Sequence, residues 1–360
     1  MIHEFNTKDG VYLKSDNSTM KMMYHVIIVL IPFVLYNFYI NGISPFISGN
    51  SLLTLFYPII MVVVSIITCL LTEYLYYLIK KEKKSFLYLI ENSFSIIPGI
   101  FISLIVPVTT PIWLIIVGCV VASLSKMLSG GLSKNKLNPA LLGALVILLI
   151  SRFAFNDYIT GLTNQTLNYD LLVGTNMNLG NYLLGNILNP VGSSCIILVI
   201  LAFFYLVINN VIKYRIPLIS ILTVIMISFI VMLIRGVGIW YMLYHLVSGS
   251  FLFMVVLMAT DPVTSPLNKY GEVYAGILIG FITMLFRLLT PFSYSSLITI
   301  LIVNLLTILI NKITIKFYYK KSILKVITIV LLLVVAITSV IVAPKNKEIN
   351  RDDEVVYADY

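Results

Sequence analysis

The chain has 360 residues, of which 59% are hydrophobic and 11% are charged, whereas a soluble domain has roughly 45–50% apolar and about 25% charged residues. So few charged side chains cannot cover a surface in water, which excludes a soluble globular enzyme and indicates a protein embedded in lipid. The net charge of +9 does not indicate nucleic-acid binding, because the 24 lysine and arginine residues lie in short loops and form no basic arm or domain.

The first 20 residues are polar, and we expect residues 1–22 to form a cytoplasmic N-terminal segment rather than a cleavable signal peptide. Eleven apolar runs with the composition of membrane helices follow, and they cover residues 23–40, 53–79, 94–106, 112–128, 139–153, 195–212, 216–234, 239–258, 273–289, 296–312 and 323–343. The run at 94–106 is too short to cross a bilayer unless it is a half-helix, because a spanning helix needs about 20 residues. The sequence therefore predicts an all-α integral membrane protein.

Lysine and arginine are distributed unequally between alternate loops. With the N-terminus in the cytoplasm, 18 of them lie on the inner side and 6 on the outer side, and positive residues favour the cytoplasmic side. This predicts a multi-pass protein of the cell membrane with a cytoplasmic N-terminus. The one long loop, residues 154–194, then lies outside the cell. It is rich in Asn, Thr and Gly and is too long for a connector, so it is a candidate functional loop.

A short motif occurs twice, as PVTTP at 107–111 and as PVTSP at 262–266, with an offset of 155 residues. Five predicted helices separate the copies, and an odd number of crossings places them on opposite faces of the membrane. This is typical of an inverted repeat, although a chance match is the alternative in so biased a sequence. We expect a ten-helix core of two inverted five-helix repeats, residues 23–153 and 195–312. Residues 313–360 add an extra C-terminal transmembrane helix and a polar tail.

Residues 129–146 connect two predicted helices. Gly130 and Gly131 end the first helix, and the next one begins with Asn138 as N-cap and Pro139 as its first residue. The free amides of that helix start, with two lysines nearby, suit a phosphate or another anion. A plain turn with positive residues on the inner side explains the same pattern, and both interpretations stay open.

Thr260, Asp261 and Pro262 interrupt another apolar stretch. Asp261 is one of few acidic residues close to the hydrocarbon region, where an ionisable group usually marks an ion or cofactor path. An aspartate that caps a helix start is the alternative, and the two roles are compatible. We expect His245 to be a hydrogen-bonded packing residue, and Arg287 to extend from an outer helix end toward the membrane surface.

The sequence contains no recognisable catalytic or metal-binding motif. Cys69, Cys119 and Cys195 are isolated in or beside apolar runs, without a CxxC pair or a neighbouring histidine. We expect them to pack as small apolar side chains, and we expect neither a metal site nor an iron–sulfur centre in this chain. No HExxH, GxSxG, Walker or dinucleotide-binding glycine pattern is present, so the chain is not a catalytic centre by itself.

Several segments together resemble one known family. They are KSDNSTMKMMYHVIIVLIP near the start, SGGLSKNKLNPALLGALV at 129–146, RIPLISILTV at 215–224, HLVSGSFLFMVVLMATDPVTSP at 245–266, and GILIGF at 276–281 with Arg287. In this order they are similar to the D subunit of the Rnf complex and to its homologue, the B subunit of the sodium-pumping NADH:quinone reductase. The short N-terminal region is more like that of the Rnf subunit. The resemblance implies a membrane subunit of a redox-driven pump, in which electrons pass between ferredoxin and NAD while sodium ions or protons are exported.

The resemblance also implies a flavin. Members of the family bind FMN through a phosphoester to the Thr of an S-G-A-T motif in the outer loop after helix five, with an Asp three residues before the Ser. Here Asp170 and Gly174 match, but Val173, Thr175 and Asn176 replace the Ser, the Ala and the modified Thr. Asparagine cannot form a phosphoester. Either the motif has slipped by one residue and Thr175 carries the FMN, or the FMN is held non-covalently, or it is absent.

From the same resemblance we expect the other subunits of an Rnf-type complex as partners, among them a second flavoprotein subunit, and an FMN transferase for maturation. We expect the ion path near Asp261, together with Thr260, Thr264 and Asn138. The alternative is a secondary transporter or channel with the same inverted repeat and no redox chemistry. A third reading is a structural subunit that has kept the fold and lost the flavin.

Overall fold

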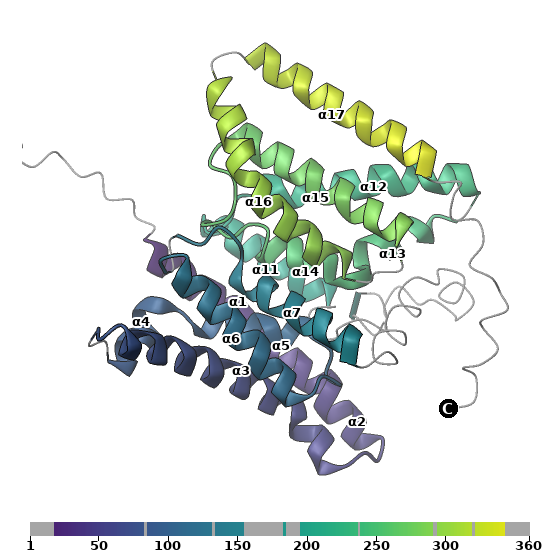
Figure 1. Ribbon diagram of the computed structural model, residues 1–360. Helices are drawn as coiled ribbons and strands as arrows, with labels where there is room; N and C mark the ends of the chain where they lie inside the picture. Colours follow the sequence, from purple (N-terminus) through teal and green to yellow (C-terminus); the bar gives the residue numbers. More distant parts are fainter. Residues whose placement is uncertain are drawn as a thin grey trace, which may run out of the picture.

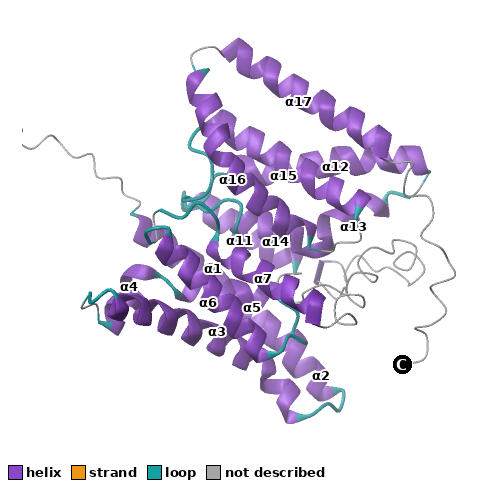
Figure 2. Ribbon diagram, viewed as in Figure 1, coloured by secondary structure: helices purple, strands orange, loops and turns teal. Residues whose placement is uncertain are grey.

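The computed structural model describes residues 18–82, 85–131, 134–154, 183–184, 195–236, 238–290, 294–318 and 321–342. These residues form helices that are joined by turns, with no strand among them (Figure 2). The predicted all-α fold is therefore confirmed for this part of the chain.

The first group of helices extends from residue 19 to residue 154 (Figure 1). Helix α1 (Thr19–Phe38) continues through a π-helical turn, η1 (Tyr39–Ile43), into α2 (Ser44–Ile47), and then come α3 (Leu52–Ile79), α4 (Phe86–Ser93), α5 (Ile96–Ile105), α6 (Ile112–Leu128) and α7 (Pro139–Ala154). The predicted run 94–106 is therefore a ten-residue helix, α5, that follows a separate eight-residue helix, α4. Neither is long enough to cross a bilayer alone.

The second group contains α11 (Ile196–Ile208), α12 (Arg215–Arg235), α13 (Trp240–Val247), a 3₁₀ turn η3 (Ser248–Ser250), α14 (Phe251–Leu257), α15 (Lys269–Leu289), α16 (Ser295–Lys316) and α17 (Lys321–Val342). The prediction of one continuous helix over 239–258 is wrong. The helix is interrupted at Gly249 and Ser250, whose φ angles of 64° and 55° lie in the left-handed region. A glycine enters that region at no steric cost, and the α-helix cannot continue through it.

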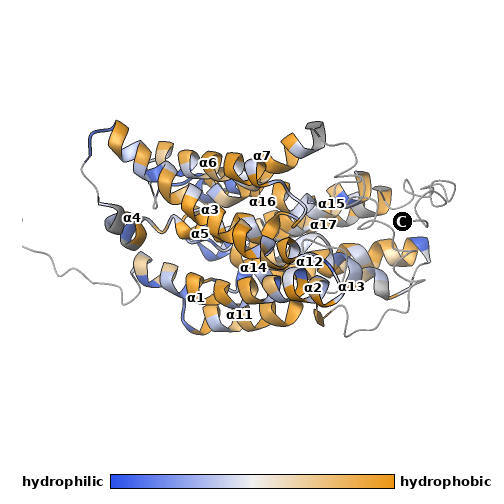
Figure 3. Cartoon of the chain, turned by 90° about the horizontal axis from the view of Figure 1, so that it is seen from below, coloured by the Kyte–Doolittle hydropathy of each residue, from blue (hydrophilic) through white to orange (hydrophobic). Residues whose placement is uncertain are grey.

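Five helices are long and apolar enough to cross a membrane, and they are Thr19–Ile47, Leu52–Ile79, Arg215–Arg235, Lys269–Leu289 and Ser295–Lys316. The apolar helices α5, α6, α7 and α11 are shorter. Many large apolar side chains are exposed on the outside of the bundle, for example Leu53, Leu222 and Ile329, and Figure 3 shows that apolar residues dominate the helices along their length. A surface of this kind is stable in lipid and not in water.

Polar side chains at the helix starts replace the missing intrahelical acceptors. The Ser18 hydroxyl accepts a hydrogen bond from the backbone N–H of Lys21 at 3.2 Å, before α1. Asn138 Oδ1 accepts from the N–H of Ala140 at 3.1 Å, and Pro139 is the first residue of α7. The predicted N-cap at Asn138 is confirmed, and so are the left-handed conformations of Gly130 and Gly131, with φ angles of 103° and 95°.

Two helix pairs approach closely because glycine lies at each contact. A Cβ on Gly143 of α7 would lie 2.5 Å from the carbonyl oxygen of Gly118 on α6, and a Cβ on Gly280 of α15 would lie 2.6 Å from Cβ of Thr223 on α12. Small residues at such contacts are typical of membrane helix pairs, where van der Waals packing replaces the hydrophobic effect as the source of association.

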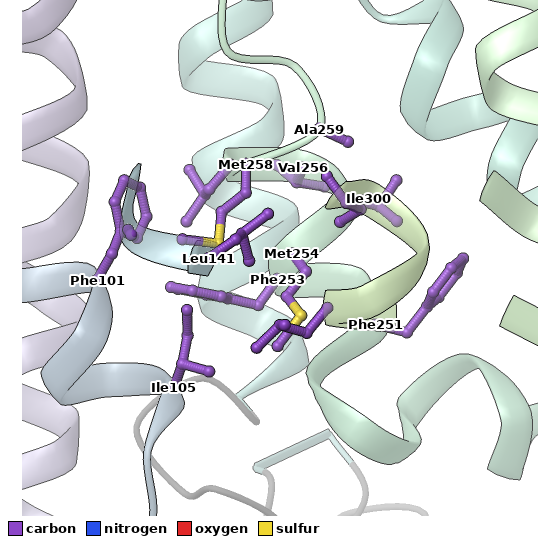
Figure 4. Close-up of a cluster of buried hydrophobic side chains, with 14 of the residues drawn as sticks. Phe101, Ile105, Leu141, Phe251, Phe253, Met254, Val256, Met258, Ala259 and Ile300 are labelled. Atoms are coloured by element: carbon purple, nitrogen blue, oxygen red, sulfur yellow. The ribbon is translucent and has the colours of Figure 1, made fainter. Parts of the chain in front are cut away.

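The two groups of helices meet in a buried apolar cluster (Figure 4). Phe101 and Ile105 come from α5, Leu141 from α7, and Phe253 from α14. The ring centroids of Phe101 and Phe253 are 6.0 Å apart, with an interplanar angle of 77°, which is a favourable edge-to-face arrangement. The short helices α5 and α14 are thus in contact at the centre of the molecule.

Candidate functional site

Asp261 lies in the non-helical connection between α14 and α15. Its carboxylate accepts hydrogen bonds from the backbone N–H of Val263 at 3.4 Å and from the hydroxyl of Thr264 at 3.3 Å. Its own carbonyl oxygen accepts from the N–H groups of Thr264 and Ser265, at 3.2 and 3.0 Å. These bonds hold a tight turn, which is the local role expected of an aspartate at such a position. They leave acceptor capacity on the carboxylate.

Thr260 and Asn138 also serve the ends of helices. The buried hydroxyl of Thr260 donates to the carbonyl oxygen of Val256 at 2.6 Å, in the last turn of α14. The buried Asn138 side chain caps α7, as described above, and its amide nitrogen takes no part in that bond. Each of the predicted site residues therefore has a structural role of its own.

One cavity brings these residues together, although they are far apart in the sequence. Asn138, Thr260 and Asp261 line it, and Thr264 adjoins it through its bond to Asp261. The space is about 750 Å³, part of which is open to the outside. The remaining walls are mostly apolar and come from α1, α5, α11, α14, the connection before α7 and the first residues of α7. They include Met22, Met23, Phe94, Ile97, Pro98 and Phe101. A few convergent polar groups in an apolar cavity are typical of a binding site.

A second amide of the connection before α7 faces the same cavity. Asn135 is buried and lines the space, and its Oδ1 atom has no hydrogen-bond partner among the described residues. A buried acceptor without a donor is costly, by about 1–3 kcal/mol. Asn135 Oδ1 and the remaining acceptor capacity of the Asp261 carboxylate are the chemistry that a hard cation or a hydrogen-bond donor needs.

A buried ion pair, which the sequence does not predict, adjoins the cavity. Lys126 of α6 lies 3.5 Å from the Glu73 carboxylate of α3, and both side chains are almost completely buried. The Lys126 ammonium also donates to the carbonyl oxygen of Ser93 and to the hydroxyl oxygens of Ser93 and Ser95, the last two at 2.8 and 3.0 Å. Lys126 therefore lies inside the helix bundle and not in a loop. The signal that could have found the pair is Glu73, an acidic residue inside a spanning run.

Arg287 is also buried, and the prediction that it extends toward the membrane surface is wrong. Its guanidinium donates to the carbonyl oxygens of His245 and Ser248, the latter at 2.7 Å, and to the Ser295 hydroxyl at 3.1 Å. His245 packs edge-on against Tyr241 and Tyr244, with ring centroids 4.4 and 5.2 Å away. The packing role of His245 is confirmed, but neither ring nitrogen has a hydrogen-bond partner among the described residues.

The predicted flavin residues Asp170, Gly174, Thr175 and Asn176 lie outside the described residues. The cysteines Cys69, Cys119 and Cys195 are buried and free of disulfides. Cys69 and Cys119 are neighbours, since the Cys69 thiol lies 3.8 Å from the Cys119 carbonyl oxygen. No cluster of three His, Cys, Asp or Glu residues suited to a metal ion occurs in the described ranges.

Comparison with known proteins gives a consistent result. The family model described as "NQR2, RnfD, RnfE family" matches residues 6–320. The D subunit of the Na⁺-translocating ferredoxin:NAD⁺ oxidoreductase complex of Acetobacterium woodii is 24% identical over 314 residues, which cover 84% of this chain and 91% of that protein. The D subunit of the proton-translocating ferredoxin:NAD⁺ oxidoreductase complex of Clostridium ljungdahlii is 25% identical over 332 residues, which cover 86% of this chain and 94% of that protein. The B subunit of the Na⁺-translocating NADH-quinone reductase of Pseudomonas paraeruginosa is 27% identical over 235 residues, which cover 60% of this chain and 58% of that protein.

Proposed function

The chain belongs to the NQR2, RnfD, RnfE family, and from this premise we propose that it is the membrane subunit of an ion-translocating ferredoxin:NAD oxidoreductase of the Rnf type. In this role it couples electron transfer through the complex to the export of sodium ions or protons. Its similarity to the D subunits of two such complexes along most of both chains supports the proposal. We place the protein in the cell membrane with its N-terminus in the cytoplasm, on the basis of the lysine and arginine distribution.

The cavity beside Asp261 carries the ion-path part of the proposal. It lies where α14 ends and α7 begins, so that helix ends and a turn border it instead of a continuous helix wall. Interrupted helices are where membrane transporters expose backbone and side-chain oxygens to an ion. The Asp261 carboxylate supplies the charge, and the amides of Asn135 and Asn138 supply neutral polar atoms. Thr264 holds the carboxylate in position through its hydroxyl.

Charge balance in the cavity favours a cation. Lys126 lines the cavity, and its ammonium is neutralised by Glu73, which lies 3.5 Å away. Among the described residues that line the cavity, the Asp261 carboxylate has no such cationic partner. A carboxylate at this depth is stabilised by a cation, which favours entry of Na⁺ or H⁺. The geometry does not distinguish the two ions.

We further propose that the chain carries FMN on the outer loop, residues 154–194. A flavin accepts and passes on electrons when it is bound. Of the residues in the altered motif, Thr175 has the hydroxyl that a phosphoester requires, and Asp170 and Gly174 keep the surrounding pattern. Asn176 stands where the modified Thr is expected and has no such hydroxyl. Flavin fluorescence distinguishes three cases. Covalent attachment at Thr175 gives a fluorescent protein band, non-covalent binding gives flavin only in an extract, and absence of the flavin gives neither.

The proposal requires partners. A single subunit with one flavin has no entry point for electrons from ferredoxin, so the other subunits of the complex, including a second flavoprotein, must supply and receive them. Covalent attachment also requires an FMN transferase.

The competing proposal is a secondary transporter or channel of the same fold. The cavity around Asp261 fits it equally well because nothing in the cavity needs a flavin.

Deletion of this subunit from the complex in its host distinguishes the two proposals. Membrane vesicles from the wild type are expected to take up ions when reduced ferredoxin and NAD⁺ are added, and vesicles from the deletion strain to lose both this uptake and ferredoxin-dependent NAD⁺ reduction. Re-expression of the subunit is expected to restore both activities. Ferredoxin-dependent NAD⁺ reduction at the wild-type rate in the deletion strain would reject the electron-transport role and leave the transporter.

A further inference from the structure

The chain is interrupted at two places that are 155 residues apart. The turn at 93–95 separates the eight-residue helix α4, which ends at Ser93, from α5, and Ser248–Ser250 separate the eight-residue helix α13 from α14. The middle residue is left-handed in both, with φ 50° at Phe94 and φ 64° at Gly249. The offset is the same as that between the motifs PVTTP and PVTSP, which follow α5 and α14. Sequence spacing and backbone conformation thus relate the two interruptions.

A buried cation lies at each interruption. At the first, the Lys126 ammonium of α6 donates to the carbonyl oxygen of Ser93, the last residue of α4, and to the hydroxyl oxygen of Ser95 beyond it. At the second, the Arg287 guanidinium of α15 donates to the carbonyl oxygens of His245, in the last turn of α13, and of Ser248 just after it. Each cation comes from the helix that follows the repeated proline-flanked motif.

The chemistry at the two ends is therefore the same. The last carbonyl groups of a helix have no intrahelical partner, and in a membrane protein no bulk water is available to replace it. A cation beside them satisfies the carbonyl groups and opposes the negative end of the helix dipole. Removal of the cation leaves these acceptors buried and unpaired, so the break is expected to open or to rearrange.

We propose that Lys126 and Arg287 are positioning residues with the same role, each of which holds the carbonyl end of one interrupted helix and so fixes the short helix that follows it. Lys126 fixes α5, whose residues Ile97, Pro98 and Phe101 form a wall of the cavity. Arg287 fixes α14, which ends beside Asp261. Figure 1 shows α4 at one end of the bundle and α13 toward the other, so the two cations act at opposite ends and stabilise helices that meet at Phe101 and Phe253.

The two positions differ in their counter-charge. Glu73 neutralises Lys126, whereas Arg287 has no acidic partner among the described residues. Arg287 is held by backbone carbonyls and the Ser295 hydroxyl. The function that we assign to both cations follows from their contacts with the helix ends and does not depend on ion translocation. The role of Lys126 in shaping the cavity rests on the proposed function.

Thiol labelling in native membranes tests the proposal. Two reporters are placed at equivalent positions 155 residues apart, Ile97→Cys in the first turn of α5 and Leu252→Cys in the first turn of α14. The three native cysteines are buried, so the chain without a reporter gives the background. Labelling with N-ethylmaleimide is followed by mass spectrometry of the purified protein. Each reporter is combined with Lys126→Met, Lys126→Arg, Arg287→Met or Arg287→Lys.

Lys126→Met is expected to raise the labelling rate at position 97 about tenfold while position 252 changes less than about twofold, because the opening is local. Arg287→Met is expected to raise the labelling rate at position 252 about tenfold while the rate at position 97 changes less than about twofold. Lys126→Arg and Arg287→Lys keep the cation and are expected to restore rates close to those of the parent. An unchanged rate at the reporter beside the altered cation, or an equal rise at both reporters, would overturn the proposal. If Lys126→Met does not accumulate in the membrane, Lys126→Gln replaces it with the same criteria. Labelling needs no electron or ion transfer, so failure of the proposed function would not change this result.

Discussion

The Nζ atom of Lys126 lies 3.5 Å from Oε2 of Glu73, and both side chains are almost completely buried. The pair joins α6 to α3, and Lys126 also reaches the end of α4. Removal of one partner leaves an uncompensated charge in a medium of low dielectric constant, whereas removal of both leaves none. The stability of the protein therefore depends on the two residues jointly.

We predict that Glu73→Met and Lys126→Met each destabilise the protein by about 3–5 kcal/mol, and that the double substitution costs clearly less than the sum. Thermal unfolding of the purified protein in detergent measures this. Strictly additive effects would show that the two charges do not interact in the folded protein. The lipid-facing substitution Leu53→Ala on α3 serves as the control, because that side chain is exposed.

Packing between α12 and α15 gives a second prediction. A Cβ on Gly280 would lie 2.6 Å from Cβ of Thr223 and 2.8 Å from the Ser220 carbonyl oxygen, so Gly280→Ala must push the helices apart. We expect a loss of about 1–3 kcal/mol, typical of an overpacked contact. Leu289→Ala at the exposed end of α15 is the matched control. A Gly280→Ala protein with the thermal midpoint of the wild type would refute the close approach.

Asn138 has two roles that one pair of variants separates. Asn138→Ala removes the N-cap of α7 and should cost about 0.5–2 kcal/mol, while Asn138→Ser keeps a capping oxygen and should cost only a fraction of this. If the side-chain amide also faces the ion, Asn138→Ser should restore stability but not the number of ions moved per electron. If the serine variant recovers both the stability and the number of ions moved per electron, Asn138 acts only as a helix cap.

The flavin site is tested by ultraviolet fluorescence of the protein after denaturing electrophoresis, in a host that contains the FMN transferase. Attachment at Thr175 predicts a fluorescent band that is lost in Thr175→Ala and retained in Asn176→Ala. Non-covalent binding predicts no band, but flavin in an extract of the native protein. Neither a band nor extractable flavin would contradict the electron-carrier role of this chain.

The positions of the helices could be predicted from the sequence because lipid imposes long apolar runs that turn residues interrupt. Asn138 and Pro139 identified the start of α7, and the glycines at 130 and 131 identified the end of the preceding helix. The break within 239–258 was not predicted, because Ser248, Gly249 and Ser250 are small and do not lower the hydropathy of the run enough to mark an interruption.

The buried charges could not be placed from local sequence. Lys126 occurs near two loop lysines and Arg287 near a helix end, so each resembles a surface residue. Their burial depends on partners that are distant in the chain, Glu73 and Ser93 for Lys126 and His245 and Ser248 for Arg287. The convergence of Asn138 and Asp261 on one cavity likewise requires the tertiary fold.

The most direct test of the ion path is the number of ions moved per electron in sealed vesicles that contain the whole complex with Asp261→Asn. This substitution keeps the shape of the side chain and its ability to form hydrogen bonds with Val263 and Thr264, and it removes the charge. The matched control is Glu272→Gln, since Glu272 is paired with Lys213 and Arg215 and does not line the cavity.

We predict that Asp261→Asn assembles normally and lowers the number of ions moved per electron by about tenfold or more, as expected for the loss of an intramembrane charge on an ion path. Glu272→Gln should leave this ratio at the wild-type value. An unchanged ratio in a fully assembled Asp261→Asn complex would contradict the ion path and leave Asp261 as the residue that holds the turn between α14 and α15.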